Sequence, residues 1–134
     1  MKIDIKFLLL LITLSCKLPE KNEFDLCKRL GVIEENLNVE KSGFYMFVDF
    51  DNCPNCSELL KSRITWFLKD YDGSVIVSVR NKKKAKLILG DSLFNKVNFD
   101  IVGISKDLNL INDTPVIYQM KEGECDSFII NLFN

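Results

Sequence analysis

The chain has 134 residues, with 18 lysines and arginines against 19 aspartates and glutamates, so its formal net charge is −1. This balance gives no support for nucleic-acid binding, which relies on clustered positive charge. Histidine is absent, which removes the commonest general base and the commonest metal ligand. The length suffices for one compact domain with a single core.

The first predicted element is an export signal over residues 1–15. Lys2 and Lys6 give a basic start, and an apolar run then extends from Phe7 to Leu14. This run is shorter than the ~20 apolar residues that span a membrane. A basic start, a short apolar run and a small residue before a possible cleavage point are typical of a bacterial secretion signal. We therefore expect an exported protein.

Cys16 ends the apolar run, and Leu14-Ser15-Cys16 resembles the lipobox of bacterial lipoproteins. The resemblance implies that Cys16 carries lipid and anchors the chain on the periplasmic or cell-surface side of a bacterial membrane. The polar residues 16–23 are interpreted as the lipid-attachment cysteine and its tether, which leaves residues 24–134 as the domain. A freely released periplasmic protein is the alternative.

Hydrophobic periodicity predicts alternating helices and strands along the domain. A short helix over residues 23–37 is expected to break near Gly31, and a helix over residues 83–95 is interrupted by Gly90. Residues 105–112 are predicted as a polar turn region, and residues 121–124 as a turn. The other predicted elements are strands 44–50, 74–79, 99–104, 115–120 and 126–133 and a helix over residues 57–69.

Residues 44–50 are almost continuously apolar, which predicts a strand buried on both faces of a sheet. The helix 57–69 joins this strand to strand 74–79, so the two strands should be parallel with a right-handed crossover. The basic cluster Arg80-Asn81-Lys82-Lys83-Lys84 is interpreted as a solvated loop or helix start. The chain is therefore predicted to be an α/β protein.

The motif Cys53-Pro54-Asn55-Cys56 lies between the first predicted strand and the helix that follows it. A cysteine in the first turn of a helix faces free backbone N–H groups and the positive end of the helix dipole, which favour the thiolate. The second cysteine is one turn further on, close enough to form a disulfide with the first. Pro54 suits the first helical turn, where its missing N–H costs no hydrogen bond. The pattern predicts a redox site.

Cys27 and Cys125 are the other two cysteines of the predicted domain. An even set of cysteines in an exported chain suggests disulfides, and Cys53 pairs with Cys56 by proximity. Nothing in the sequence brings Cys27 close to Cys125, so a second disulfide and two buried free thiols both remain open. Zinc bound by all four is a further alternative, although no second C-x-x-C or histidine completes the usual spacing. We predict no metal site.

A strand followed by C-P-N-C on a helix, a β-α-β crossover, and Thr114-Pro115 before a β-hairpin together resemble the thioredoxin fold. The similarity covers residues 43–134 and is closest to the membrane-tethered thioredoxin-like proteins of the bacterial envelope. It implies a central mixed β-sheet flanked by helices, with a C-terminal β-hairpin and without the final helix of the family. The longer segment 80–113 is expected to add a strand.

The same resemblance implies roles for individual residues. Cys53 would be the attacking thiolate and Cys56 the resolving thiol. Pro54 and Asn55 would tune the reduction potential of the pair. A cis Pro115 would lie against the cysteines, and Thr114 would present its backbone to a substrate peptide.

The implied function is thiol–disulfide exchange with protein thiols or disulfides of the cell envelope, without a cofactor and with an unidentified redox partner. Besides the longer segment 80–113 and the missing final helix, two further departures from the family are visible. Asn52 stands where the family has tryptophan, and neither Asp49 nor Asp51 matches the position of the family's proton-transferring aspartate. A non-catalytic thioredoxin-like binding module with a structural Cys53–Cys56 disulfide is the alternative.

Overall fold

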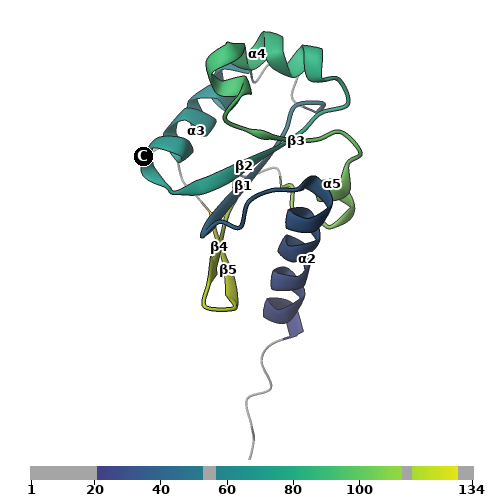
Figure 1. Cartoon of the computed structure of the whole chain (residues 1–134), viewed down its shortest axis with the longest axis vertical. Coiled ribbons are helices and arrows are strands. Elements are labelled where there is room, and N and C mark those ends of the chain that lie inside the picture. Colours follow the sequence, from purple (N-terminus) through teal and green to yellow (C-terminus); the bar gives the residue numbers. More distant parts are fainter. Residues whose placement is uncertain (1–20, 53–56, 113–115, 130–134) are drawn as a thin grey trace, which may run out of the picture.

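A five-stranded mixed sheet in the order β3-β2-β1-β4-β5 organises the chain (Figure 1). The computed structural model describes residues 21–52, 57–112 and 116–129. β1 pairs in parallel with β2, and β2 with β3, whereas β4 is antiparallel to β1 and β5 to β4. The parallel pairing of β1 with β2 confirms the prediction. The strands are β1 (Phe44–Asp49), β2 (Gly73–Ser78), β3 (Asn98–Asp100), β4 (Val116–Lys121) and β5 (Glu124–Ile129).

Helices cover both faces of the sheet, so the described residues form a mixed α/β structure. α3 connects β1 to β2 and α4 connects β2 to β3, and both pack on one face. α2 and the segment around α5 pack on the other face. None of the helices within the described ranges has the length and apolar character needed to cross a membrane. The helices in the described part of the chain are α2 (Lys21–Leu37), α3 (Ser57–Asp70), α4 (Lys82–Phe94) and α5 (Ile104–Asp107).

β1 lies at the centre of the core, and its side chains alternate between the two layers of helices. Met46 and Val48 pack in the cluster with α3 and α4, whereas Tyr45 and Phe47 pack in the cluster with α2. All four side chains are buried. The continuous apolar run is therefore a strand buried on both faces, as expected for a strand with neighbours on each side and helices above and below.

α2 continues through Gly31 without the break that the sequence suggested. Leu26, Leu30 and Ile33 recur at helical spacing, and all three are buried against the sheet. Their burial outweighs the ~1 kcal/mol that a glycine loses relative to alanine inside a helix. The helix also begins at Lys21, two residues before the predicted start.

α4 begins in the basic cluster and is kinked where the sequence predicted an interruption. The Asn81 side chain accepts a hydrogen bond from the backbone N–H of Lys83 at 2.9 Å and so caps the helix. This confirms the cluster as a helix start. Gly90 has φ 73° and ψ 166°, a conformation that is essentially restricted to glycine, and it separates two helical parts.

β3 ends at Asp100, so the prediction of a strand through residue 104 was wrong. The buried Asp100 carboxylate accepts hydrogen bonds from the backbone N–H groups of Gly103, Ile104 and Ser105 at 2.8, 3.1 and 2.7 Å. These bonds turn the chain out of the sheet and into α5. α5 therefore lies across the end of the predicted strand and within the segment predicted to be only a turn.

β4 and β5 form the predicted C-terminal hairpin. Its two turn residues, Glu122 and Gly123, both have positive φ, which fits the right-handed twist of the two strands. Because only two residues connect the strands, Lys121 pairs directly with Glu124. β5 therefore starts two residues before the predicted strand.

Candidate functional site

The residues that the sequence singles out most strongly lie outside the described ranges. These residues are Cys16, Cys53, Pro54, Asn55, Cys56, Thr114 and Pro115. The described neighbours of the C-P-N-C motif are Asn52, which follows β1, and Ser57, which begins α3.

The carboxyl ends of β1, β2 and β3 form one edge of the sheet, because these three strands are parallel. β4 runs the opposite way: Met46 pairs with Ile117, and Gln119 pairs with Phe44 at the start of β1. β4 therefore begins near the edge at which β1 ends. Ligands of open α/β sheets bind outside the carboxyl ends of the strands, so this edge is the candidate functional site.

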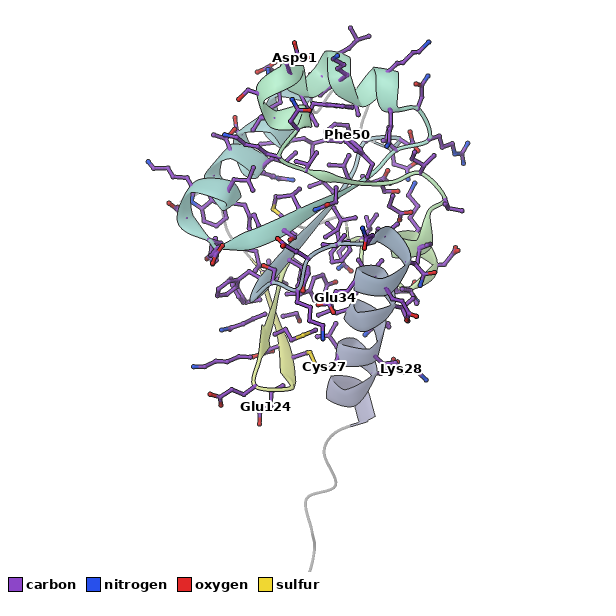
Figure 2. The ribbon with its side chains drawn as sticks, in the orientation of Figure 1. Cys27, Lys28, Glu34, Phe50, Asp91 and Glu124 are labelled. Atoms are coloured by element: carbon purple, nitrogen blue, oxygen red, sulfur yellow. A yellow bond between two sulfur atoms is a disulfide. The ribbon has the colours of Figure 1, made fainter. Side chains whose placement is uncertain are left out.

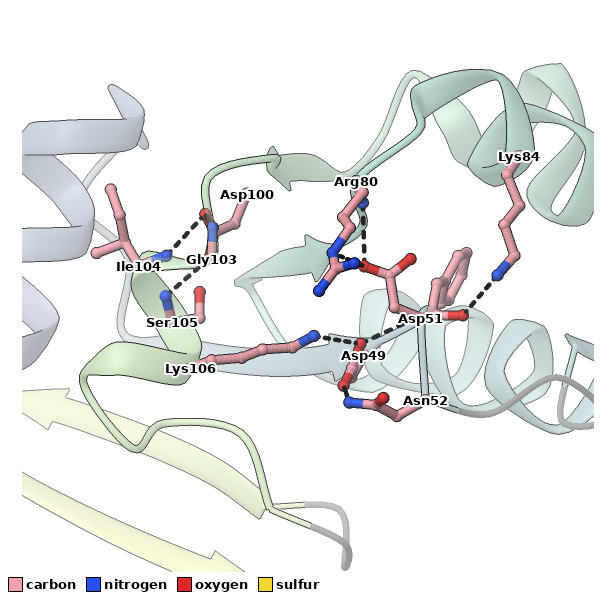
Figure 3. A network of polar contacts seen from close by, with 11 residues as sticks. Asp49, Asp51, Asn52, Arg80, Lys84, Asp100, Gly103, Ile104, Ser105 and Lys106 are labelled. Atoms are coloured by element: carbon pink, nitrogen blue, oxygen red, sulfur yellow. Dashed lines mark hydrogen bonds and ion pairs between the residues drawn. The ribbon is translucent and has the colours of Figure 1, made fainter.

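Asp49 organises the loop that leads from β1 toward the motif (Figure 3). Its Oδ1 accepts a hydrogen bond from the backbone N–H of Asp51 at 2.9 Å and lies 3.2 Å from Lys106 Nζ. Its Oδ2 accepts a hydrogen bond from the Asn52 side-chain amide at 2.6 Å. The Asp49 side chain is only 11% exposed, so these partners replace most of its hydration.

The same loop is tied to the connection between β2 and α4. Asp51 Oδ2 accepts a hydrogen bond from the backbone N–H of Arg80 at 3.1 Å, and the Arg80 guanidinium Nε lies 4.0 Å from the same oxygen. Lys84 Nζ donates to the carbonyl oxygen of Phe50 at 3.2 Å. The approach to the motif is therefore held from both sides, by α5 and by α4.

Asp100 fixes the third loop of this edge, between β3 and α5. Burial raises the pKa of its carboxyl, but the backbone hydrogen bonds from Ser105, Gly103 and Ile104 outweigh burial and bring the pKa below its ordinary value. The carboxylate therefore stays ionised and holds α5 in the position from which Lys106 reaches Asp49. In the sequence this role is indicated only weakly, by an aspartate three residues before a glycine.

A small cavity opens at this edge. Its volume is about 220 Å³, and side chains from all three loops line it. Two apolar side chains border it and remain in contact with solvent, Ile101 with 45% and Val102 with 82% of their surface exposed. The residues that line it include Asp51, Val79, Arg80, Ile101, Val102, Lys106 and Asp107.

A disulfide joins Cys27 of α2 to Cys125 of β5, with the two Cα atoms 5.3 Å apart (Figure 2). This settles the pairing that the sequence left open, and it removes both cysteines as thiolate ligands of zinc. Cys125 pairs with Met120, whose backbone N–H donates to the carbonyl oxygen of Gly43 just before β1. The bridge therefore lies at the opposite edge of the sheet from Asp49.

Among the residues that the structure describes, no three histidine, cysteine or acidic side chains lie close enough to hold a metal ion. No protein-family model matches the chain, and no curated protein matches it in sequence.

Proposed function

We propose that this protein carries out thiol–disulfide exchange with protein substrates through Cys53 and Cys56. The observation that supports this most is the setting of the motif. Its described neighbours, Asn52 and Ser57, are the end of the loop held by Asp49 and the first residue of α3. A cysteine at the start of this helix would meet the positive end of a helix dipole, which favours the reactive thiolate.

The arrangement of strands supports a thioredoxin-like fold for the domain. Such a fold needs a parallel β-α-β unit that carries the motif, next to an antiparallel hairpin. β1, α3 and β2 supply the first, and β4 with β5 supply the second, in the order β2-β1-β4-β5. β3 is the additional strand expected from the long segment 80–113, and it extends the sheet beyond β2.

The start of β4 supports roles for Thr114 and Pro115 in substrate binding. These two residues directly precede Val116, which begins β4 at the edge where β1 ends. In this proposal the backbone of Thr114 pairs with an extended substrate segment, and Pro115 lies against the cysteine pair. Fold-level likeness alone does not give function, so the cysteines themselves have to be tested.

The exchange proceeds in two balanced steps. The Cys53 thiolate attacks one sulfur of a substrate disulfide, the substrate S–S bond breaks, and the released thiolate takes a proton from water. The Cys56 thiol then loses its proton and attacks the Cys53 sulfur, which frees the second substrate thiolate and leaves a Cys53–Cys56 disulfide. A dithiol redox partner returns the pair to its reduced form. The same two exchange steps in the opposite direction oxidise a substrate dithiol.

An exported, lipid-anchored location fits this chemistry. The Cys27–Cys125 disulfide supports export, because structural disulfides persist mainly in oxidising compartments. In this proposal residues 1–15 are removed and Cys16 carries the lipid that holds the domain at a bacterial membrane. Mass spectrometry of the mature N-terminus from the membrane fraction should find a lipid-modified Cys16; an unmodified N-terminus would contradict it.

Trapping separates exchange from the non-catalytic alternative. A Cys56→Ser variant should accumulate mixed disulfides through Cys53, visible as reductant-sensitive bands on non-reducing gels. The Cys53→Ser variant is the matched control and should trap far less. Absence of trapping, together with a Cys53–Cys56 bridge that resists reduction in the wild-type chain, would instead identify a thioredoxin-like binding module with a structural disulfide.

A further inference from the structure

We propose that Ile101 and Val102, the adjacent 220 Å³ cavity and the cations around it form a docking surface for an extended protein segment with an apolar side chain flanked by acidic ones. This inference rests on the proposed exchange function, since it names the kind of substrate that the cysteine pair would receive. We call Arg80, Ile101, Val102 and Lys106 the docking surface.

The apolar part of the docking surface is unusual in its exposure. Ile101 and Val102 are two of the four large hydrophobic residues that are exposed in the described part of the chain, and they are adjacent in sequence. Exposed apolar side chains that gather beside a cavity mark interaction sites more often than isolated ones do. We therefore expect Ile101 and Val102 to contact an apolar side chain of a binding partner.

The backbone beneath the pair is held firmly. Asp100, directly before Ile101, accepts hydrogen bonds from the N–H groups of Gly103 and Ile104, directly after Val102. Both ends of this short loop are thus anchored to one buried carboxylate. A surface that is already ordered loses little conformational entropy when a partner binds, which favours affinity.

The cavity limits what can enter. Cavities for drug-sized ligands have about 300–1,000 Å³, so 220 Å³ fits a single side chain better than a whole cofactor. Its lining includes apolar Val79, Ile101 and Val102, the cations Arg80 and Lys106, and the carboxylates Asp51 and Asp107. An aliphatic side chain of a protein segment would contact the apolar part of this lining, Val79, Ile101 and Val102.

The positive charge around the cavity favours acidic residues on both sides of the inserted side chain. Arg80 is 89% exposed, and Lys82 and Lys83 of α4 are exposed as well. Lysines in the first turn of a helix add to the positive end of its dipole, so this end of α4 strongly favours anionic partners.

Asp49 and Asp51 offset the charges of Lys106 and Arg80, so the net positive charge comes from Lys82 and Lys83, which form no ion pair with any described residue. Asp49 and Asp51 are 11% and 20% exposed and already face Lys106 and Arg80, and Asp100 is fully buried. Asp107 is the acidic side chain at this edge that is exposed. Acidic residues on either side of the inserted apolar side chain therefore complement the surface.

The docking surface is also joined to the redox motif. Asp51 lines the cavity, bonds to Arg80, and lies two residues before Cys53 in the chain. A segment bound here would be held beside the approach to the cysteine pair. Substrates with an acidic and apolar sequence near their cysteines should therefore react faster than neutral or basic ones.

Binding is tested first without redox chemistry, in the full chain carrying Cys53→Ser and Cys56→Ser. The probe is a fluorescent, cysteine-free peptide with one leucine between glutamates, and anisotropy gives its Kd. Val102→Asp or Arg80→Glu should each raise the Kd about tenfold or more, as expected for loss of an anchoring contact. Peptides with lysines for the glutamates, or serine for the leucine, should bind as weakly.

Two matched controls lie away from the docking surface. Leu87→Asp replaces another exposed apolar residue, on α4, and Lys121→Glu reverses a charge in the hairpin. Both should leave the Kd unchanged. A Kd that Val102→Asp and Arg80→Glu leave within about twofold of the parent, or equal binding of the acidic and basic peptides, would overturn the docking surface. Circular dichroism checks that each variant is folded.

The cysteine-intact chain separates this inference from the proposed function. Reduction of glutathione disulfide needs no docking, so Val102→Asp should leave it unchanged while it raises the KM for a disulfide-linked acidic peptide. If wild-type protein reduces neither substrate but still binds the probe, exchange fails and the docking surface stands. If it reduces both and Val102→Asp alters neither KM, the docking surface fails and exchange stands.

Discussion

Lys106 Nζ lies 3.2 Å from Asp49 Oδ1, and this ion pair joins α5 to the end of the central strand. The two residues are far apart in the sequence, and they meet because the Asp100 carboxylate sets the start of α5. Asp49 also binds the backbone of Asp51 and the side chain of Asn52. One carboxylate thus fixes the loop immediately before the C-P-N-C motif.

Removal of the Asp49 carboxylate should loosen that loop. Asp49→Ala deletes all three contacts and should lower the free energy of unfolding by about 2 kcal/mol. Hydrogen exchange of the Asp51 amide, followed by NMR, should speed up. Asp49→Asn is the matched control, because its oxygen can still accept from the Asp51 N–H, while its amide nitrogen no longer accepts from Asn52 and the charge facing Lys106 is lost. Equal exchange rates in wild type and Asp49→Ala would contradict this role.

Asp100 should make stability sensitive to acid. The pKa of this carboxyl is lowered in the folded protein, so its contribution is present above the unfolded value of ~3.9 and is lost as the pH falls through the folded value. Asp100→Asn should lower the free energy of unfolding at neutral pH by about 2 kcal/mol, because an amide nitrogen then faces one of the backbone N–H groups.

Urea unfolding across the acid range checks this prediction. The stability of the wild type should fall more steeply below pH ~4 than that of Asp100→Asn. The exposed Asp107→Asn is the control and should behave as wild type. Parallel curves for wild type and Asp100→Asn would show that the carboxylate is not a source of acid sensitivity.

Tyr45 should make stability sensitive to alkali. Its side chain is fully buried; its hydroxyl donates to the Glu34 carboxylate and accepts from the backbone N–H of Ser42 at 2.7 Å. Burial, with the Glu34 hydrogen bond, raises the pKa of Tyr45. The contribution of this hydroxyl to the free energy of unfolding is therefore complete below its unfolded pKa of ~10. It is lost progressively as the pH rises above that value toward the raised pKa of the folded protein.

Tyr45→Phe tests this linkage. The variant should lose about 1–2 kcal/mol at neutral pH, because Ser42 and Glu34 lose a partner, and its stability should fall less between pH 9 and 11. Thermal unfolding followed by circular dichroism measures both effects. Tyr71→Phe, at a half-buried tyrosine, is the control. An unchanged alkaline slope in Tyr45→Phe would refute the linkage.

The Cys27–Cys125 disulfide should be a major source of stability. It links residues 98 apart, and the loss of chain entropy for a loop of this size is about 4–5 kcal/mol. A Cys27→Ser, Cys125→Ser double variant should therefore unfold at much lower urea concentration. The bridge lies at the edge opposite the motif, so peptide-disulfide exchange by the folded variant should persist. A loss of stability under about 1 kcal/mol would contradict the prediction.

Local patterns were enough to predict the central elements of the fold. The apolar run of β1, the helical spacing in α3 and the β-branched residues of β2 gave strands, a helix and parallel pairing that the structure confirms. The interruption predicted at Gly90 is confirmed as a kink in α4. These features depend on residues close together in the chain, for which periodicity and glycine conformation are direct signals.

Features that depend on distant contacts were not predictable in the same way. The prediction that the helix breaks near Gly31 was wrong, because burial of α2 against the sheet outweighs the low helix propensity of glycine. The extent of β3 was wrong because the Asp100 hydrogen bonds end it. The Lys106–Asp49 pair and the Cys27–Cys125 bridge each join distant segments, and no spacing rule in one sequence brings them together.

The position of the disulfide also determines how a mechanical load would travel through the molecule. The bridge closes a covalent ring that begins in α2 and ends in β5. A pull applied ahead of Lys21 would unwind α2 only as far as Cys27, and the tension would then pass into β5 and across its ladder to β4. If the chain were anchored at Cys16, a pulling force would therefore reach the sheet through its edge strand β5. The part of α2 after Cys27 would keep its packing against the core.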